Sequence, residues 1–235
     1  MRLHRFYIDK QIEGETVDIT DKDLVHQWKN VFRYNVGSQV VVFNGSGYDY
    51  LAFISSLRNL GATLTIVSKK KTPKISRCVG LAISLLKKEN IELVIQKATE
   101  LGVSFIQPII SERSEKKNLN IARAKKIALE ASEQSGRGDV PMVNEPMNLK
   151  DFLDSSFLSD FQNVIALHPE GLLLDREVID REGSFLIFVG PEGGFSEEEI
   201  KMFKDKKIEI FSLGSLVLRG ETASVAVATL FLLGR

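Results

Sequence analysis

The sequence predicts an α/β protein in which a mostly parallel sheet follows a small domain rich in β-strands. Two observations lead to this prediction. Residues 1–72 contain short alternating apolar runs, whereas residues 73–235 contain longer apolar runs separated by segments of helical periodicity. Alternation of strands and helices is typical of a parallel sheet that helices cover on both faces. We therefore expect two domains, 1–72 and 73–235.

Residues 1–72 are expected to form four strands and one helix. Turn residues separate the strands, which we place at 5–8, 39–43, 48–54 and 62–67. The helix is expected at 21–32 with Asp21 as its N-cap, because a side-chain oxygen there can accept hydrogen bonds from the first free amides. Four lysines and a proline within 68–74 oppose regular packing, so we expect a linker there.

Residues 73–235 contain five apolar runs that we expect to be strands buried on both faces. These runs are 78–86, 105–110, 164–167, 185–189 and 208–213. Ligands of parallel sheets bind at the carboxyl ends of the strands, and we expect the functional site at that edge.

Four helices are expected between and after these strands. The first two, 91–101 and 120–135, each have an apolar stripe and end at a glycine. Ser196 and Glu199 form a capping box that begins the third. The last helix, 222–233, is apolar around almost its whole circumference. Such a helix lies in the core of a large domain or at a subunit interface, and we expect a homodimer.

The composition argues against several classes of protein. Hydrophobic residues make up 43% and charged residues 26% of the chain, as in ordinary globular proteins, and no apolar run approaches the ~18 residues of a membrane span. No signal peptide is recognisable, so we expect a cytoplasmic protein. Cys78 is the single cysteine, which excludes an intramolecular disulfide, and we expect it to be a buried thiol. The three histidines are far apart, and we expect no metal.

Two segments near the C-terminus combine features of a ligand site. Gly190-Pro191-Glu192-Gly193-Gly194 follows an apolar strand, and its glycines would let main-chain amides approach a ligand closely. The second segment, 213–223, places Arg219 and Glu221 just before the last helix. The first segment alone is also compatible with a tight turn between a strand and a helix. Neither GxGxxG nor GxxxxGK[ST] occurs, so the glycines are not expected to bind a pyrophosphate.

These segments resemble motifs of the SPOUT superfamily, specifically of the ribosomal RNA small-subunit methyltransferase E family. The segments 92–102 and 133–137 match as well, in the same order, and the resemblance covers nearly the whole chain. It implies a PUA-like β-barrel joined to an α/β domain with a C-terminal trefoil knot. It also implies a homodimer that uses S-adenosyl-L-methionine to methylate N3 of a uridine in 16S rRNA, within a small ribosomal subunit or late assembly particle, without a metal.

The resemblance also implies roles for individual residues. The residues expected to hold the cofactor are Leu167, His168, Gly190, Pro191, Glu192, Gly193, Gly194, Leu213, Gly214, Leu218 and Thr222. Glu221 is a candidate base for the N3 proton, and Arg219 is a candidate for stabilising negative charge on the uracil. A structural ion pair between Arg219 and Glu221 is an equally good interpretation.

Basic residues suggest where RNA would bind. Residues 1–72 carry ten lysines and arginines against seven aspartates and glutamates, a mild surplus that suits a polyanionic partner. Those expected to contact RNA are Arg2, His4, Arg5, Lys87, Lys88, Arg113 and Arg137. Leu216 stands where many family members have arginine, and Gly220 where threonine is usual. Two alternatives remain open: a non-catalytic RNA-binding or assembly factor, and a methyltransferase acting on tRNA or another rRNA position.

Overall fold

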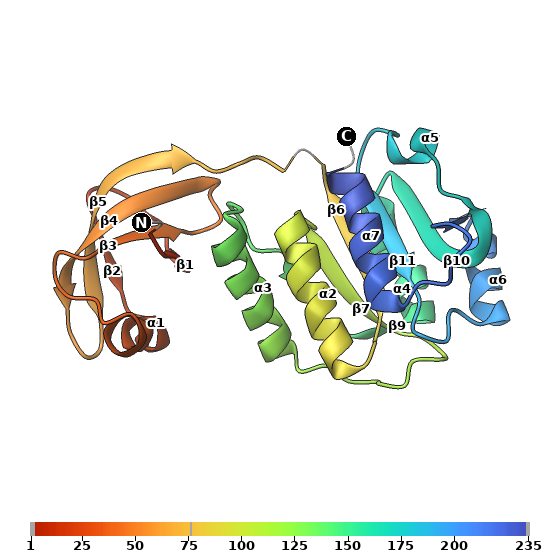
Figure 1. The fold of residues 1–235 in the computed structure, drawn as a ribbon, viewed down its shortest axis with the longest axis horizontal. Coiled ribbons are helices and arrows are strands. Elements are labelled where there is room, and N and C mark those ends of the chain that lie inside the picture. Colours follow the sequence, from red (N-terminus) through yellow and green to blue (C-terminus); the bar gives the residue numbers. More distant parts are fainter. Residues whose placement is uncertain (1–2, 76, 234–235) are drawn as a thin grey trace. The chain divides into compact units, whose positions relative to one another are not determined.

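The structure, a computed structural model, describes residues 3–75 and 77–233 and divides the chain into two compact units (Figure 1). The first unit comprises Met1–Lys74 and Ser132–Asp139, and the second comprises Ile75–Ala131 and Val140–Arg235. The structural division after Lys74 lies two residues beyond the boundary expected from the sequence. The inclusion of 132–139 in the first unit was not predicted.

The first unit is built on a five-stranded sheet of order β1-β3-β4-β5-β2, in which only the β1–β3 pair is parallel. Its strands are β1 Arg5–Tyr7, β2 Thr16–Ile19, β3 Gln39–Phe43, β4 Tyr48–Leu57 and β5 Ala62–Lys71. β2 was missed by the sequence prediction. The expectation of a linker from residue 68 was wrong, because β5 continues to Lys71 through backbone pairing with β4.

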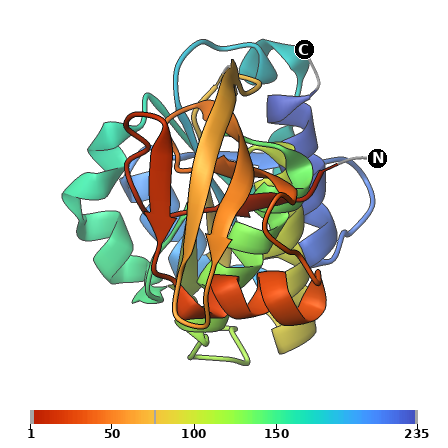
Figure 2. The same cartoon turned by 90° about the vertical axis from the view of Figure 1, so that its left-hand side faces the viewer.

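The expected helix at 21–32 divides into α1 Lys22–His26 and a π-helical turn, Gln27–Val31. Asp21 is confirmed as the N-cap, since its side chain accepts hydrogen bonds from the amides of Asp23 and Leu24. The wholly buried Trp28 follows and packs edge-on against Phe6 of the sheet. α1 lies across one end of the sheet in Figure 2.

Segment 132–139 is held to the first unit by Arg5. Its guanidinium lies 3.6 Å from the centroid of the Phe43 ring, binds the Asp49 carboxylate, and donates to the carbonyl oxygens of Ser132 and Arg137. These contacts use donors of the guanidinium in several directions, which suits an arginine better than a lysine. They explain why this segment groups with residues that precede it by more than sixty positions.

The second unit contains a parallel sheet of order β12-β10-β11-β6-β7-β8, with β9 also paired to β7. Its strands are β6 Val79–Ser84, β7 Phe105–Ile110, β8 Met142–Val143, β9 Met147–Asn148, β10 Asn163–Leu173, β11 Phe185–Val189 and β12 Glu209–Ser212. Every described pairing in this sheet is parallel, as the sequence predicted.

Helices cover both faces of this sheet, because successive side chains of the central strands point to opposite sides. The helices are α2 Lys88–Leu101, α3 Ile121–Ser135, α4 Leu149–Asp154, α5 Arg176–Ile179, α6 Glu197–Asp205 and α7 Gly220–Leu232, with a 3-10 turn at Ser156–Asp160. Ile187 of β11 belongs to the core that includes α2, α3 and α7, whereas its neighbour Phe188 belongs to the core with α4 and α6. α2 and α7 lie side by side (Figure 1).

The predicted end of α2 and the predicted start of α6 are confirmed. Gly102 ends α2 with φ of 104°, in the left-handed region that glycine adopts without strain. The predicted capping box is present: Ser196 and Glu199 exchange hydrogen bonds between side chain and backbone at the start of α6. The short elements α4, α5, β8 and β9 were not predicted.

The expectation of a buried Cys78 is wrong, because this residue precedes β6 and is exposed. The residue before it, Arg77, is the buried one at 6% exposure. Its guanidinium lies 4.2 Å from the centroid of the Phe185 ring and donates to the carbonyl oxygens of Ile179 and Gly183. A search of the described residues finds no helix with the length and apolar character that a bilayer span requires.

Candidate functional site

A cavity of about 260 Å³ opens at the carboxyl ends of β11 and β12 and at residues 167–169 in the middle of β10, beside the start of α7. Its lining consists of 167–169, 189–194, 211–213 and 216–218, together with Gly220 and Ala223. The cavity thus lies beside the edge of the sheet at which the sequence places the functional site. The two motifs that the sequence singled out, separated by about two dozen residues, line one shared space.

Most of the residues expected to hold the cofactor line this cavity. They are Leu167, His168, Gly190, Pro191, Glu192, Gly193, Gly194, Leu213 and Leu218. Gly214 and Thr222 do not line it: the amide of Gly214 donates to the Ser212 hydroxyl, and Thr222 is exposed on α7. Eight further lining residues were missed: Pro169, Val189, Phe211, Ser212, Leu216, Val217, Gly220 and Ala223. The adjacent apolar pair Leu216 and Val217, in a loop between glycines, was an available signal.

The segment after β11 forms a tight turn. The amide of Gly194 donates to the carbonyl oxygen of Pro191 at 2.9 Å, and Gly194 has φ of 68°. A residue with a β-carbon would be strained there, so glycine is required. Phe195 is buried and packs edge-on against Phe203 of α6. The turn thus presents main chain to the cavity while its flank is fixed by aromatic packing.

A bulge in β10 supplies the opposite part of the lining. Leu167 and Leu172 both pair with Phe211 of β12, so residues 168–171 loop out of the sheet. Gly171 allows this loop to lie close to β12, because a Cβ there would come within 2.7 Å of the Phe211 carbonyl carbon. The amide of Glu170 donates to Nδ1 of His168 at 3.3 Å. The bulge therefore places His168 and Pro169 at the cavity.

The start of α7 approaches the β11 turn closely. A Cβ at Gly220 would lie 2.8 Å from Cδ2 of Leu86 and 3.2 Å from the carbonyl oxygen of Gly190. Glycine at position 220 is therefore matched to the leucine at position 86 in this chain. Contact between these two segments brings both motifs into the same wall of the cavity.

We expect Gly220→Ala to lower the free energy of unfolding by about 1–3 kcal/mol, because the added methyl group overpacks the contact with Leu86. Leu86→Ala removes the colliding methyl groups, so Gly220→Ala should cost much less in that background. Urea unfolding of the wild type, both single variants and the double variant measures this coupling. Equal costs of Gly220→Ala in both backgrounds would contradict the assignment.

The two candidate catalytic residues flank Gly220 at the start of α7. Arg219 is exposed at the N-cap position, and Glu221 is half-buried in the first turn. Oε2 of Glu221 is buried and has no hydrogen-bond partner within the described residues. Nor does any ion pair join Arg219 to Glu221 in this part of the chain. The interpretation of the two residues as a structural ion pair therefore lacks support.

Neighbouring loops brace the β11 turn. Nη1 of Arg113 donates to the carbonyl oxygen of Gly193 at 2.9 Å, and the amide of Lys87 donates to the Glu192 carboxylate at 3.3 Å. The buried Glu199 accepts from the amides of Glu112 at 2.8 Å and Ser196 at 2.9 Å. One carboxylate thus joins the loop after β7 to the start of α6.

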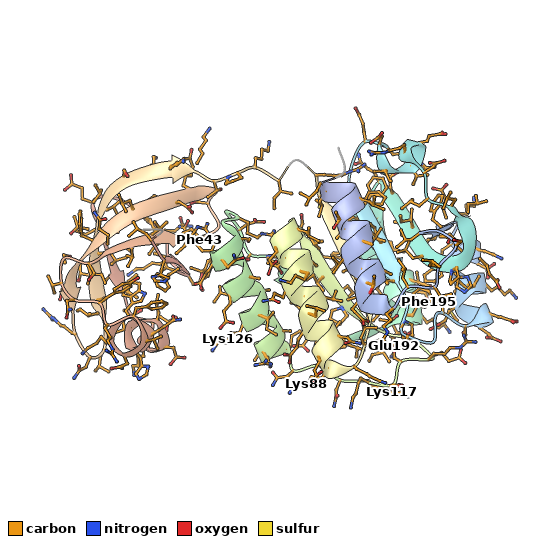
Figure 3. The ribbon with its side chains drawn as sticks, in the orientation of Figure 1. Phe43, Lys88, Lys117, Lys126, Glu192 and Phe195 are labelled. Atoms are coloured by element: carbon orange, nitrogen blue, oxygen red, sulfur yellow. The ribbon has the colours of Figure 1, made fainter. Side chains whose placement is uncertain are left out.

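The residues expected to bind RNA fall into two groups. Lys87, Lys88 and Arg113 are exposed in the second unit, and Figure 3 shows Lys88 at the same edge as Glu192 and Lys117. In the first unit, His4 is exposed, with Nδ1 2.7 Å from the Tyr34 hydroxyl. Arg5 and Arg137 are engaged in structural contacts of the first unit, and their side chains are 9% and 4% exposed. They therefore offer RNA little surface. Arg2 lies outside the described residues.

Glu92, in one of the motifs that carried the resemblance, has a structural role. Both of its carboxylate oxygens accept from Arg123, at 2.6 and 2.7 Å, which joins α2 to α3. The hydrogen bonds from this guanidinium lower the pKa of the Glu92 carboxyl. The described residues contain no group of three or more His, Cys, Asp or Glu side chains arranged to hold a metal ion.

Comparisons with known proteins agree on one family. The profile of the RNA methyltransferase domain matches residues 73–232. The chain is similar to ribosomal RNA small subunit methyltransferase E of Rickettsia conorii, with 30% identity over 243 residues that cover 100% of this chain and 97% of the relative. It is also similar to ribosomal RNA small subunit methyltransferase E 2 of Borreliella burgdorferi, at 32% identity over 91% and 90% of the two chains.

Two solved structures resemble this one along almost its full length. One is a ribosomal RNA small subunit methyltransferase E from Neisseria gonorrhoeae bound to S-adenosyl methionine, with TM-score 0.86, 29% identity and coverage of 97% of this chain and 96% of that one. The other is a putative methyltransferase from Legionella pneumophila in complex with the same cofactor, with TM-score 0.90, 27% identity and coverage of 100% and 98%.

Proposed function

Because the chain belongs to the ribosomal RNA small subunit methyltransferase E family, we propose that it transfers a methyl group from S-adenosyl-L-methionine to 16S rRNA. The acceptor that we propose is N3 of a uridine in the small ribosomal subunit or a late assembly particle. The observation that carries this proposal is that the β11 turn and the segment before α7 line the same cavity. The two solved structures at TM-scores of 0.86 and 0.90 contain the same cofactor, which supports the assignment.

The residues around the cavity fit S-adenosyl-L-methionine. The lining combines main chain of the Gly190–Gly194 turn with the apolar side chains of Leu167, Leu213 and Leu218. Such a mixture suits a ligand that has an adenine ring, a ribose and an amino-acid end. When bound, the cofactor supplies an electrophilic sulfonium methyl group. Alignment of reactants by the cavity can contribute ~7–11 kcal/mol to lowering the barrier.

Two residues at the start of α7 supply the remaining chemistry in this proposal. Transfer to N3 of uridine requires removal of a weakly acidic proton and stabilisation of the negative charge that remains on the uracil. Glu221 is the proposed proton acceptor, since its buried Oε2 has no partner within the described residues. The exposed Arg219 guanidinium is the proposed stabiliser of charge on the uracil oxygens. The Leu216-Val217-Leu218 loop would exclude water.

The two parts of the chain have different proposed roles. Residues 1–72 form a PUA-like RNA-binding domain, and residues 73–235 form a SPOUT methyltransferase domain whose C-terminal segment is threaded through a trefoil knot. The family resemblance carries both assignments, and the position of late-synthesised β11 between β6 and β10 is compatible with such threading.

A cytoplasmic homodimer is part of the same proposal. Apolar side chains that a partner subunit would cover are exposed near the cavity: Leu172 at 76%, Leu173 at 67%, Leu216 at 78% and Val217 at 83%.

Cells that lack this protein are expected to lose one methylated uridine from small-subunit rRNA, because the proposal assigns this modification to this protein alone. Nucleoside analysis by mass spectrometry measures the loss, and complementation with the wild-type chain should restore the modification. Persistence of the modified nucleoside would contradict the 16S rRNA assignment, and loss of a methylated nucleoside from tRNA would redirect it. A chain that binds no cofactor in calorimetry would instead be a non-catalytic factor.

A further inference from the structure

The carboxyl half of β5 forms an exposed edge of the first unit. β2 pairs with β5 only over Ala62–Thr65. Beyond this point, residues 68–71 of β5 pair with β4 alone within the described part of the chain. Figure 2 shows β5 running from the end of the sheet where α1 lies toward the opposite end. The lysines of β5 therefore lie where this strand extends past its neighbour β2.

Cross-strand register places tyrosines and lysines on one face of this extension. Tyr48 pairs with Lys71, and Tyr50 pairs with Lys69. Directly paired residues share a face of a sheet, and so do residues two apart in a strand. These four side chains, which we term the Tyr–Lys face, therefore alternate aromatic and basic groups. Lys70, paired with Asp49, lies on the opposite face.

The Tyr–Lys face is accessible, and none of the ion pairs among the described residues involves its lysines. Lys69 and Lys71 are exposed, and both tyrosines are half-buried. Nζ of Lys69 lies 5.2 Å from the centroid of the Tyr48 ring, which steadies the ammonium beside the aromatic surface. The nearest carboxylate in sequence, Asp49, is on the other face and binds Arg5. Tyr50 packs against the apolar core of the first unit, and this contact restricts the movement of its ring.

We infer that the Tyr–Lys face binds a single-stranded segment of RNA. Lysines alone would suit any polyanion, including an acidic protein. Aromatic rings between lysines favour nucleic acid, because bases stack on the rings while phosphates lie near the ammonium groups. The inference deepens the proposed function and rests on it, because it names the surface by which the first unit would hold rRNA. The Tyr–Lys face takes the place of Arg5 and Arg137 as the expected RNA contact of the first unit, because structural contacts occupy those two arginines.

Charge contacts are tested by the salt dependence of binding. The probe is a fluorescein-labelled oligouridine RNA of about twelve nucleotides, a length within the range of single-strand sites. Fluorescence anisotropy follows its binding to the full chain across a salt series. Lys69→Gln combined with Lys71→Gln should weaken binding and lower the slope of log K against log salt by about 1.4, about 0.7 for each phosphate contact.

Lys70→Gln is the matched control, because it removes the same charge from the same strand on the opposite face. It should leave the slope unchanged. If Lys70→Gln lowers the slope by about 0.7, the value for one phosphate contact, binding depends on general charge and the inference is overturned.

Stacking is tested separately with Tyr48→Leu, which keeps an apolar side chain but removes the ring. The variant should bind the same probe at least about fivefold more weakly with an unchanged salt slope. Wild-type affinity for Tyr48→Leu, or equal affinity of the wild type for a duplex of the same length, would overturn the inference.

Calorimetry with S-adenosyl-L-methionine separates this inference from the proposed function. The Tyr48 and Lys69 variants should bind the cofactor as the wild type does, because they lie in a different unit from the cavity. Failure of the wild type to bind cofactor would contradict the proposed function alone. Unchanged RNA binding by the variants would overturn the inference alone.

Discussion

Replacing Arg219 with alanine is expected to slow methyl transfer about 100- to 1000-fold while cofactor affinity stays at the wild-type value. The guanidinium is exposed between two residues that line the cavity, Leu218 and Gly220, but does not itself form part of the lining. In the proposed mechanism its loss would therefore remove the charge that stabilises the acceptor base and leave the cofactor walls in place. Single-turnover transfer of a labelled methyl group measures the rate, and calorimetry measures cofactor affinity.

Two variants serve as controls for Arg219→Ala. Arg219→Lys keeps the positive charge and should recover part of the lost rate, although a lysine cannot reproduce the planar fork of donors. Arg176→Ala removes an exposed arginine from α5 and should leave transfer unchanged. If Arg219→Ala weakened cofactor binding in proportion to the lost rate, Arg219 would be part of the cofactor site and not a stabiliser of the acceptor.

Replacing Glu199 with alanine is expected to lower the free energy of unfolding by about 2–4 kcal/mol. The carboxylate accepts from the amides of Ser196 and Glu112, and each donor left without an acceptor costs about 1–3 kcal/mol. The loop after β7 would also lose its attachment to α6. Cofactor affinity should fall as well, because the β11 turn runs directly into this helix. Urea unfolding and calorimetry measure the two effects.

Glu198→Ala is the matched control for Glu199→Ala, since it removes a neighbouring exposed carboxylate from the same helix turn. Its effect on the free energy of unfolding should stay within about 0.5 kcal/mol. Equal effects of the two substitutions would show that charge near the helix N-terminus, and not the bridge made by Glu199, is responsible.

Local signals allowed much of the fold to be predicted. The capping box at Ser196, the glycine that ends α2 and the apolar run of β11 each depend on neighbouring residues, and the structure has all three. β2 was missed because it has only four residues, of which two are apolar, Val17 and Ile19. β5 was predicted too short because its lysines were interpreted as part of a linker. Exposed lysines are also compatible with a strand that pairs on only one side, as β5 does here.

Features that depend on distant contacts could not be predicted from the sequence. The bulge at 168–171 exists because Gly171 lies against β12, and the placement of 132–139 depends on Arg5. The cavity illustrates both cases. Its glycine turn has a local signature, whereas the role of Gly220 is evident only when Leu86 is seen beside it.

The order of strands in the second unit has a consequence for biosynthesis. β11 lies between β6 and β10, yet the ribosome completes β6, β7 and β10 before it reaches β11. One edge of β6 therefore stays unpaired until β11 has been synthesised, and an unpaired strand edge can aggregate with other nascent chains. A messenger RNA truncated before the codons of β11 would yield a polypeptide that has an unpaired edge of β6 and lacks the cavity. Competence for methylation thus arises only after the start of α7, which completes the lining of the cavity, has been synthesised.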